Sequence, residues 1–455
     1  MLNLETFKQD WDTRFPDVRL RRSHFILAVS GGVDSIVLTH LMHTVKANCT
    51  IAHVNFQLRG AESQRDEQFV RDFAEQLNMP IKVHLVDTAK YAATYKLGIQ
   101  QAAREIRYAW FGALMQEIES NKPVVLLTAH HANDNVETVL MQLFRGTGIH
   151  GLTGIPYRRK DVLNMARPLI HFSKEDILAY AAANGLTYVE DSSNEKDNYT
   201  RNFIRNKLLP QIASIYPNVN ENILATSQRI AEAEQIVIQA VDSFWKKGIK
   251  LKKGIPTIPV TYWNKVRDND TYTWGLVKKY GFKPQQLVEI HKLLTANKGA
   301  YIASSSHKLI QWDHQIQIVS LVAEKEYLSI DQTAIGNTIT TKHGQLHFEL
   351  IKNTPDLVMD KDPRFAYLDA SKMEWPLLLR SWEPSDYFYP LGMPKKKKLN
   401  QFLGNLKLSP AIKSKVNVLC SGDRIAWVVG TRIDDRFKIK SSTQKVLKIT
   451  FLSKV

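Results

Sequence analysis

Six consecutive residues, Ser30-Gly31-Gly32-Val33-Asp34-Ser35, combine glycines, hydroxyls and a carboxylate in a spacing suited to phosphate chemistry. The apolar run 25–29 before them predicts a buried parallel strand, and the apolar residues after them recur at helical spacing. A glycine turn between a strand and a helix directs backbone N–H groups and the helix N-terminus toward an anion. The glycines let the backbone approach a phosphate closely, because no Cβ stands in the way. We therefore predict a phosphate-binding loop at these six residues.

Asp34 is unusual in such a loop, because its carboxylate repels phosphate unless a magnesium ion or a helix-capping role intervenes. The segment is not a Walker A loop, since Gly-x-x-x-x-Gly-Lys-Ser/Thr is absent and with it the lysine that contacts the β- and γ-phosphates. The alternative is a plain turn with an aspartate near the helix start. That alternative explains the glycines alone better than it explains the complete hexapeptide.

Strands and helices alternate through the first half of the chain. Strands are predicted over 50–54, 81–85 and 123–128, and helices over 62–77 and 99–119. This alternation predicts a doubly wound parallel sheet of the α/β class. Ligands of such sheets bind at the carboxyl ends of the strands, beside a change in strand order. Ser30, His53 and His130 all fall at predicted strand ends, so we expect them near one site.

Charged residues cluster at three further places in this half. Arg104 and Arg107 share a helix face, which is either an anion site or a solvated, ion-paired face. Arg145 opens a glycine-rich turn after a helix, which is either a plain helix end or a segment near phosphate. The acidic residues of the segment 190–194 have three alternative roles: they belong to a plain turn, they hold Mg²⁺, or they bind the ammonium group of an amine substrate. The spacing leaves these alternatives open.

The totals limit the class of protein. At 455 residues the chain is expected to form about two to four domains. No long apolar run is present and the first residues are too polar for a signal peptide, so we expect no membrane span and a cytoplasmic location. Two isolated cysteines, Cys49 and Cys420, argue against iron–sulfur or zinc–cysteine chemistry. The net charge of +16 favours a polyanionic partner such as nucleic acid over a merely basic enzyme.

The order of motifs resembles one family of enzymes. The loop resembles that of the PP-loop ATP pyrophosphatases, which cleave ATP between the α- and β-phosphates, and residues 20–215 closely resemble the tRNA(Ile)-lysidine synthetase family. The motifs that carry this resemblance are, in order, Ser30–Ser35, His53-Val54-Asn55, Leu58-Arg59, Ala103-Arg104-x-x-Arg107-Tyr108, Thr128-Ala129-His130-His131, Asp134, Glu137-Thr138, Arg145-Gly146-x-Gly148, Arg167-Pro168-Leu169, Asp191-Ser192-Ser193-Asn194 and Arg201-Asn202-x-x-Arg205. The sequence departs from the family pattern at Phe56, where many relatives carry a second histidine, and at Pro384-Ser385-Asp386, where Gly-Asp is usual.

The resemblance implies an architecture of three parts. A Rossmann-like PP-loop catalytic domain would occupy residues 1–215, and a mainly helical domain that contacts tRNA would occupy residues 216–320. Residues 321–455 would form a strand-rich connector and a small α/β C-terminal domain that grips tRNA. The lysine run 395–398 in that part is either a solvated surface or a phosphate contact.

The resemblance also implies a reaction and its partners. ATP with Mg²⁺ would adenylate the wobble cytidine of a CAU-anticodon tRNA(Ile), and the amine of free lysine would then displace AMP to leave lysidine. The enzyme would act as a monomer or a homodimer.

Site residues follow from the matched motifs. The implied catalytic residues are Asp34, Arg104, Asp134 and Asp191, with Asp34 also the metal ligand. The nucleotide would contact Ser30, Gly31, Gly32, Val33, Asp34, Ser35, His53 and Asn55. Substrate would contact Arg107, Glu137, Arg145, Arg201, Arg205, Lys395 and Lys396.

Two rival functions remain at this stage. A tRNA thiolase or an amidotransferase-coupled synthetase would use the same nucleotide chemistry, but it would need catalytic cysteines or an amidotransferase nucleophile that the sequence does not present. A tRNA-binding or chaperone-like protein with a regulatory nucleotide site belongs to a different class. Pyrophosphate release would distinguish that second rival from an enzyme.

Overall fold

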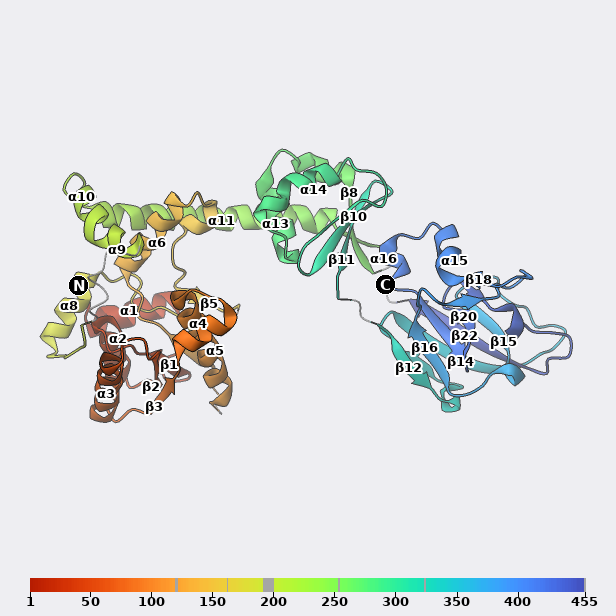
Figure 1. Cartoon of the computed structure of the whole chain (residues 1–455), viewed down its shortest axis with the longest axis horizontal. Helices are drawn as coiled ribbons and strands as arrows, with labels where there is room; N and C mark the ends of the chain where they lie inside the picture. The colour runs from red at the N-terminus through yellow and green to blue at the C-terminus, as the bar shows by residue number, and fades with distance from the viewer. Residues whose placement is uncertain (119–121, 162, 191–199, 253, 323–324, 454–455) are drawn as a thin grey trace. The chain divides into compact units, whose positions relative to one another are not determined.

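The computed structural model describes residues 1–118, 122–161, 163–190, 200–252, 254–322 and 325–453 (Figure 1). The chain divides into two compact units, Met1–Ile236 and Val237–Val455. Each unit has its own hydrophobic core. None of the helices in the described ranges has the length and apolar character that a bilayer crossing requires.

The first unit is built on a six-stranded sheet with the order β3-β2-β1-β4-β6-β5. Its strands are β1 (His24–Ala28), β2 (Asn48–Asn55), β3 (Ile81–Leu85), β4 (Val124–Leu127), β5 (Arg158–Arg159) and β6 (Met165–Ala166). All pairs are parallel except β5 with β6. The chain passes from β1 to β2 on one side and returns to β4 on the other, so the change in strand order lies at β1. This is the predicted doubly wound sheet.

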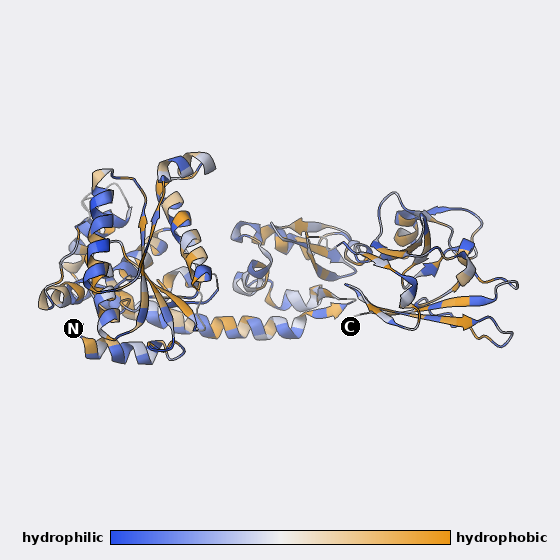
Figure 2. Ribbon diagram, turned by 90° about the horizontal axis from the view of Figure 1, so that it is seen from below, coloured by the Kyte–Doolittle hydropathy of each residue, from blue (hydrophilic) through white to orange (hydrophobic). Residues whose placement is uncertain are grey.

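Helices cover both faces of this sheet. The helices that begin in the first unit are α1 (Leu4–Arg14), α2 (Val33–Thr44), α3 (Ala61–Gln76), α4 (Thr88–Tyr95), α5 (Ile99–Glu117), α6 (Ala132–Phe144), α7 (Ile149–Leu152), α8 (Lys174–Ala183), α9 (Thr200–Phe203), α10 (Leu209–Ala213) and α11 (Val219–Gly248), with a π-helical turn at Ile204–Leu208. Helix α11 continues across the boundary between the units, and hydrophobic and hydrophilic residues alternate along it (Figure 2).

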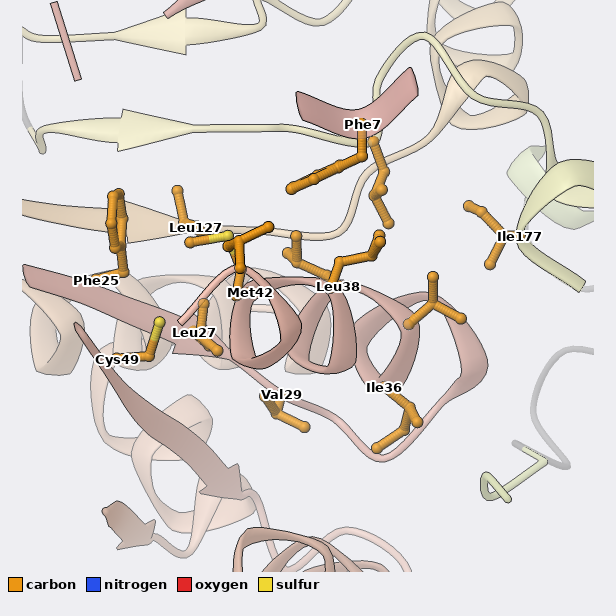
Figure 3. Close-up of a cluster of buried hydrophobic side chains, with 14 of the residues drawn as sticks. Phe7, Phe25, Leu27, Val29, Ile36, Leu38, Met42, Cys49, Leu127 and Ile177 are labelled. Atoms are coloured by element: carbon orange, nitrogen blue, oxygen red, sulfur yellow. The ribbon is translucent and has the colours of Figure 1, made fainter. Parts of the chain in front are cut away.

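Side chains of β1 enter two different cores. Phe25 and Leu27 pack with residues of α2 such as Leu38 and Met42 (Figure 3). Ile26 packs on the opposite face with Phe111 of α5. Because successive strand residues point to opposite faces, a strand covered on both sides has to be apolar throughout. This explains why β1 reads as a continuous apolar run.

The second unit begins with a segment that contains helices and a sheet. Its helices are α12 (Val260–Trp263), α13 (Asp270–Val277) and α14 (Leu287–Leu293). In addition to these expected helices there is an antiparallel sheet with the order β7-β8-β11-β10-β9. Its strands are β7 (Lys250–Lys252), β8 (Ile255–Pro259), β9 (Tyr301–Ala303), β10 (His307–Trp312) and β11 (Gln315–Ser320). Short strands that pair through tight turns gave a weaker sequence pattern than the helices between them.

The rest of the second unit is rich in strands, as expected. Two sheets have the orders β12-β16-β19-β20-β21 and β13-β14-β22-β15, and β17 pairs with β18. The elements are β12 (Tyr327–Ile330), β13 (Thr338–Thr340), β14 (Gly344–Lys352), β15 (Phe365–Asp369), β16 (Leu377–Ser381), β17 (Tyr387–Phe388), β18 (Lys397–Lys398), β19 (Asn417–Ser421), β20 (Arg424–Val428), β21 (Arg432–Ile433), β22 (Lys445–Ser453), α15 (Leu399–Asn405) and α16 (Pro410–Lys413). Phe348 and Ile449 of one sheet share a core with Leu379 and Trp427 of the other.

Candidate active site

The predicted phosphate loop lies between β1 and α2. Gly31 has φ +95°, a conformation that side-chain-bearing residues rarely adopt, and its carbonyl accepts a hydrogen bond of 3.0 Å from the Val189 N–H. The hydroxyl of Ser35 donates to the Gly32 carbonyl at 2.8 Å and accepts from the Ser30 N–H at 3.3 Å. Helix α2 begins within these six residues, at Val33, so the first N–H groups of the helix have no carbonyl of their own helix to bond. The loop thus has the form of an anion-binding turn.

A cavity of about 280 Å³ opens beside this loop. Its walls come from the ends of β1, β2 and β4 and from α5, which is where a doubly wound sheet places its ligands. The lining residues are Ala28, Val29, Ser30, Asp34, Ser35, Ala52, Val54, Phe56, Arg107, Tyr108, Phe111, Thr128, Ala129, His130, Asp134 and Arg201. This lining combines apolar side chains with polar groups of the loop and of α6, which suits a nucleoside with its phosphates at the loop.

His53 and Asn55 do not line the cavity. Residues Ala52, Val54 and Phe56 face it, and the pleat of the strand turns the two intervening side chains to the other face of the sheet. His53 Nδ1 lies 2.9 Å from the Val29 carbonyl oxygen, and Asn55 Nδ2 donates to Glu67 Oε2 at 2.8 Å. The structure therefore uses both side chains to brace the loop and the turn after β2, and does not bring them to the predicted nucleotide position.

Phe56 supports one of the two predicted arginines of α5. The Arg107 guanidinium lies 5.2 Å from the centre of the Phe56 ring, within the range of a cation–π contact, and Arg107 lines the cavity. Arg104 lies over the ring of Tyr108 at 4.9 Å, but it is not among the residues that line the cavity. The departure from the family pattern at Phe56 thus supplies an aromatic surface under Arg107.

Two acidic side chains of α6 are joined to two arginines of the segment 200–205. Glu137 is fully buried and accepts from Arg201 Nε at 2.6 Å and from Arg205 Nε at 2.5 Å. Asp134 accepts from Arg201 Nη2 at 3.0 Å and from the His131 N–H at 3.1 Å. Four of the predicted site residues therefore form a single ion-pair network, and Asp134 and Arg201 of this network face the cavity.

Electrostatic contacts keep the Asp134 carboxylate ionised. Burial alone would raise the pKa of Asp134, but His131, Arg201 and His130 together lower that pKa below its ordinary range. Burial also lowers the pKa of His130 to about 4, so this imidazole is neutral at pH 7. An ionised, partly neutralised carboxylate can hold an ammonium group, and it is a weaker base than a carboxylate with a raised pKa.

Asp34 of the loop lies near the side chains of Lys174 and His131. Its Oδ1 is 2.6 Å from Lys174 Nζ, and its Oδ2 is 3.9 Å from His131 Nε2. The described residues contain no group of three or more His, Cys, Asp or Glu side chains that could hold a metal ion. Magnesium bound together with nucleotide phosphates needs only one or two protein carboxylates, because phosphate oxygens and water complete its shell. A single aspartate at a phosphate loop fits that mode of binding.

Comparisons with known proteins cover most of the chain and agree with one another. A family model of a PP-loop domain matches residues 4–212, a TilS substrate binding domain model matches 252–315 and a TilS substrate C-terminal domain model matches 377–449. A tRNA(Ile)-lysidine synthase from Parabacteroides distasonis is 38% identical over 94% of this chain and 95% of its own length. The chain belongs to the tRNA(Ile)-lysidine synthase family. A second member, from Bacteroides thetaiotaomicron, is 34% identical over 93% of this chain and 94% of its own length.

One of the solved structures similar to this chain is that of a U34-tRNA thiolase from Methanococcus maripaludis with its [4Fe-4S] cluster. It is similar with a TM-score of 0.42 and 18% sequence identity, and the match covers 50% of this chain and 78% of that one.

Three other residues predicted to contact substrate are not among those that line the cavity. Arg145 is exposed after the end of α6, where Gly146 has φ +70°, and it does not line the cavity. Lys395 and Lys396 belong to the second unit, where the Lys396 ammonium lies 5.2 Å from the centre of the Tyr387 ring. Asp191 lies outside the described residues.

Asp34 makes two contacts that were not expected from the synthase motifs. Its partners are His131 and Lys174. Lys174 directly follows Ser173, whose hydroxyl caps α8 by accepting from the Asp176 N–H at 3.1 Å. The sequence signal was this Ser-x-x-Asp capping pattern, which places a lysine at the first position of a helix. Nothing in the sequence places that helix beside the loop.

Proposed function

We propose that this chain is an ATP-dependent ligase that joins free lysine to the wobble cytidine of a CAU-anticodon tRNA(Ile), with release of AMP and pyrophosphate. The observation that carries the proposal is the combination of a phosphate loop that opens into a nucleoside-sized cavity with nearly full-length similarity to tRNA(Ile)-lysidine synthases.

In the first step we assign ATP to the loop and the cavity. The cytosine oxygen at position 2 forms a bond to the α-phosphorus of ATP, and the bond from that phosphorus to the oxygen bridging to the β-phosphate breaks. Pyrophosphate leaves, with its charge stabilised by the N–H groups of the loop and by the Ser30 hydroxyl. Arg107 faces the same cavity and would stabilise charge that develops at the α-phosphate. Arg104 would act from the neighbouring turn of α5.

In the second step the side-chain nitrogen of lysine bonds to carbon 2 of the adenylated base, and the bond from that carbon to the AMP oxygen breaks. The lysine ammonium must lose a proton before it attacks. We assign Asp134 to binding this ammonium, because the carboxylate is ionised, lines the cavity and is held in place by Arg201. Glu137 and Arg205 would fix the orientation of Asp134 from behind, and Asp191 is the second candidate base.

Mg²⁺ would be held by Asp34 together with the phosphates of ATP. When bound, the ion would neutralise charge on the departing pyrophosphate. This assignment is supported by the position of Asp34 at the first turn of α2 and by its place in the lining of the cavity.

The remaining parts of the chain would bind the RNA. We propose the boundaries 1–215, 216–320 and 321–455 for the catalytic, middle and C-terminal domains, and contacts of Lys395, Lys396 and Arg145 with tRNA phosphates. The net charge of +16 supports a polyanionic substrate. We also propose that the enzyme is cytoplasmic and acts as a monomer or a homodimer.

The chemistry of the cysteines supports ligation over sulfur transfer. Burial raises the pKa of the Cys49 thiol to about 12, and Cys420 is buried in the other unit with a pKa that burial also raises. A thiolate nucleophile or cluster ligand needs a lowered pKa and access to substrate. Neither cysteine meets these conditions.

The test is a pyrophosphate-release assay with Mg·ATP, lysine and a tRNA(Ile) transcript that carries CAU. Lysine is omitted in one arm, and the anticodon is changed in another. We expect release to require the CAU transcript, and radiolabelled lysine to appear in the RNA. Release that needs neither tRNA nor lysine would leave the ATP site standing and overturn the substrate assignment, and no release at all would favour a regulatory nucleotide site.

A further inference from the structure

Lys174 reaches the phosphate loop from a different element. It is the first residue of α8, and its Nζ lies 2.6 Å from Asp34 Oδ1. The side chains of the two residues are 33% and 29% exposed, so the ion pair lies at the edge of the loop where a ligand has access. Lys174 is not among the residues that line the cavity, but its partner Asp34 lines it.

The backbone of Lys174 is held independently of this ion pair. Its N–H donates to Asn133 Oδ1 of α6 at 3.0 Å. The preceding Ser173 forms a reciprocal capping box with Asp176, and Ile177 of the same helix is fully buried in the core that α2 also enters. Packing and capping therefore fix the backbone of Lys174 beside the loop, and the ion pair with Asp34 holds its ammonium there.

The loop lacks the lysine that Walker A loops provide for the β- and γ-phosphates. The two arginines nearest to the anionic end of the cavity, Arg201 and Arg205, already neutralise Asp134 and Glu137. Pyrophosphate carries several negative charges, and backbone N–H groups alone neutralise them incompletely. A further cation at the loop would add to the charge neutralisation assigned to Mg²⁺ and Arg107, and Lys174 is placed beside the loop to supply it.

We propose that Lys174 is a pyrophosphate ligand of this enzyme, and that Asp34 positions its ammonium beside the loop until phosphate oxygens replace the carboxylate as its partner. Lys174 would then contact the β- or γ-phosphate of ATP and the departing pyrophosphate. The proposal rests on the proposed use of ATP at this loop, and it does not depend on which RNA or amine is ligated.

Calorimetric titration with inorganic pyrophosphate, without magnesium, tests the contact directly. We expect Lys174→Met to weaken pyrophosphate binding by about tenfold to a hundredfold, because a charge-assisted contact is lost. Adenosine binding should stay within about twofold, and Lys174→Arg should retain most of the pyrophosphate affinity. Lys160→Met is the matched control, since the Lys160 ammonium pairs with Asp17 and lies outside the cavity lining.

A second variant separates a direct contact from mere neutralisation of Asp34. If Lys174 only cancels the charge of Asp34, then Asp34→Asn in the Lys174→Met background should restore pyrophosphate binding. If Lys174 binds phosphate, the double variant should remain weak. Unchanged binding in Lys174→Met, or recovery in the double variant, overturns the proposal. Normal pyrophosphate binding without any lysine ligation would instead refute the proposed substrates, and absence of pyrophosphate binding to the unaltered protein would refute both.

Discussion

Individual side chains at the site are tuned by their neighbours. Asp134 is buried, which by itself would favour its neutral form, yet positive neighbours keep it ionised. Arg107 keeps its guanidinium at the cavity through the ring of Phe56. Each of these side chains depends on a partner from a different element, so the properties of one residue cannot be assigned from its type alone.

Asp134→Asn tests the proposed ammonium contact. The amide keeps the size of the side chain but removes the charge, so we expect lysidine formation to fall by about 10²–10⁴-fold, the usual range for such a group. The measurement is incorporation of labelled lysine into the tRNA at saturating ATP, with thermal unfolding to verify that the variant is folded. Asp12→Asn, an exposed change on α1, serves as the control. Near-normal turnover in a folded Asp134→Asn protein would show that the assigned role is wrong.

The histidine beside Asp134 predicts acid sensitivity. The pKa of His130 is about 4 in the folded protein, below the ordinary value near 6.5. Between these values the unfolded chain binds a proton that the folded chain does not, so stability falls as the pH is lowered through this window. The lowered pKa of Asp134 acts in the same direction, because its stabilising contribution is present at high pH and is lost as the pH falls through its folded pKa.

We expect His130→Asn to reduce the acid dependence of the thermal unfolding midpoint, compared between about pH 7.5 and about pH 5. His43→Asn, at an exposed histidine of α2, should leave that dependence unchanged. Equal dependence in both variants would contradict the explanation.

At the scale of elements, the site is assembled where several helices start or end. Helix α2 starts at the loop, α8 starts at Lys174, and α6 carries the acidic pair that meets the segment 200–205. The π-helical turn at Ile204–Leu208 directly follows α9, and Arg205 lies within it. Such turns are frequent at functional sites, and here the turn carries an arginine of the ion-pair network.

Glu137→Gln tests how strongly this network holds the segment 200–208 against α6. The change leaves two guanidinium groups facing an uncharged, fully buried side chain. We expect a loss of about 1–3 kcal/mol, below the usual cost of breaking a fully buried pair because both arginines are partly exposed. Chemical denaturation measures this loss, and Glu117→Gln, at an exposed ion pair with Lys82, should change stability by less than about 1 kcal/mol. Equal effects of the two changes would show that the network is not structural.

At the scale of the whole molecule, the excess of positive charge bears on the binding of RNA. The loop, the cavity beside it and the acidic network all lie in the first unit, whereas the lysine run 395–398 lies in the second. Electrostatic binding of RNA depends on the number of phosphates that are neutralised, and it weakens as salt displaces the protein.

The double variant Lys395→Ala with Lys396→Ala should weaken tRNA binding at all salt concentrations. The slope of log affinity against log salt should become shallower by about one to two, the number of phosphate contacts removed. Filter binding across a salt series measures both quantities. Lys8→Ala with Lys90→Ala, two exposed changes in the first unit, removes the same charge elsewhere. An identical slope in both double variants would assign the effect to net charge instead of to a contact.

The sequence by itself determined the local features of this protein. The apolar run of β1, the glycine turn and the alternation of strands with helices depend on residues close together in the chain, and each was predicted correctly. The family, too, followed from the order of short motifs, and nearly full-length relatives confirm it.

Only the tertiary structure decided which side chains meet. The pleat of β2 turns the side chains of His53 and Asn55 away from the cavity. Val54 and Phe56 line the cavity instead. Lys174 reaches Asp34 across 140 positions of sequence, because α8 packs beside α2. A contact of this kind depends on the packing of whole elements, so it cannot be predicted from residue types and their spacing.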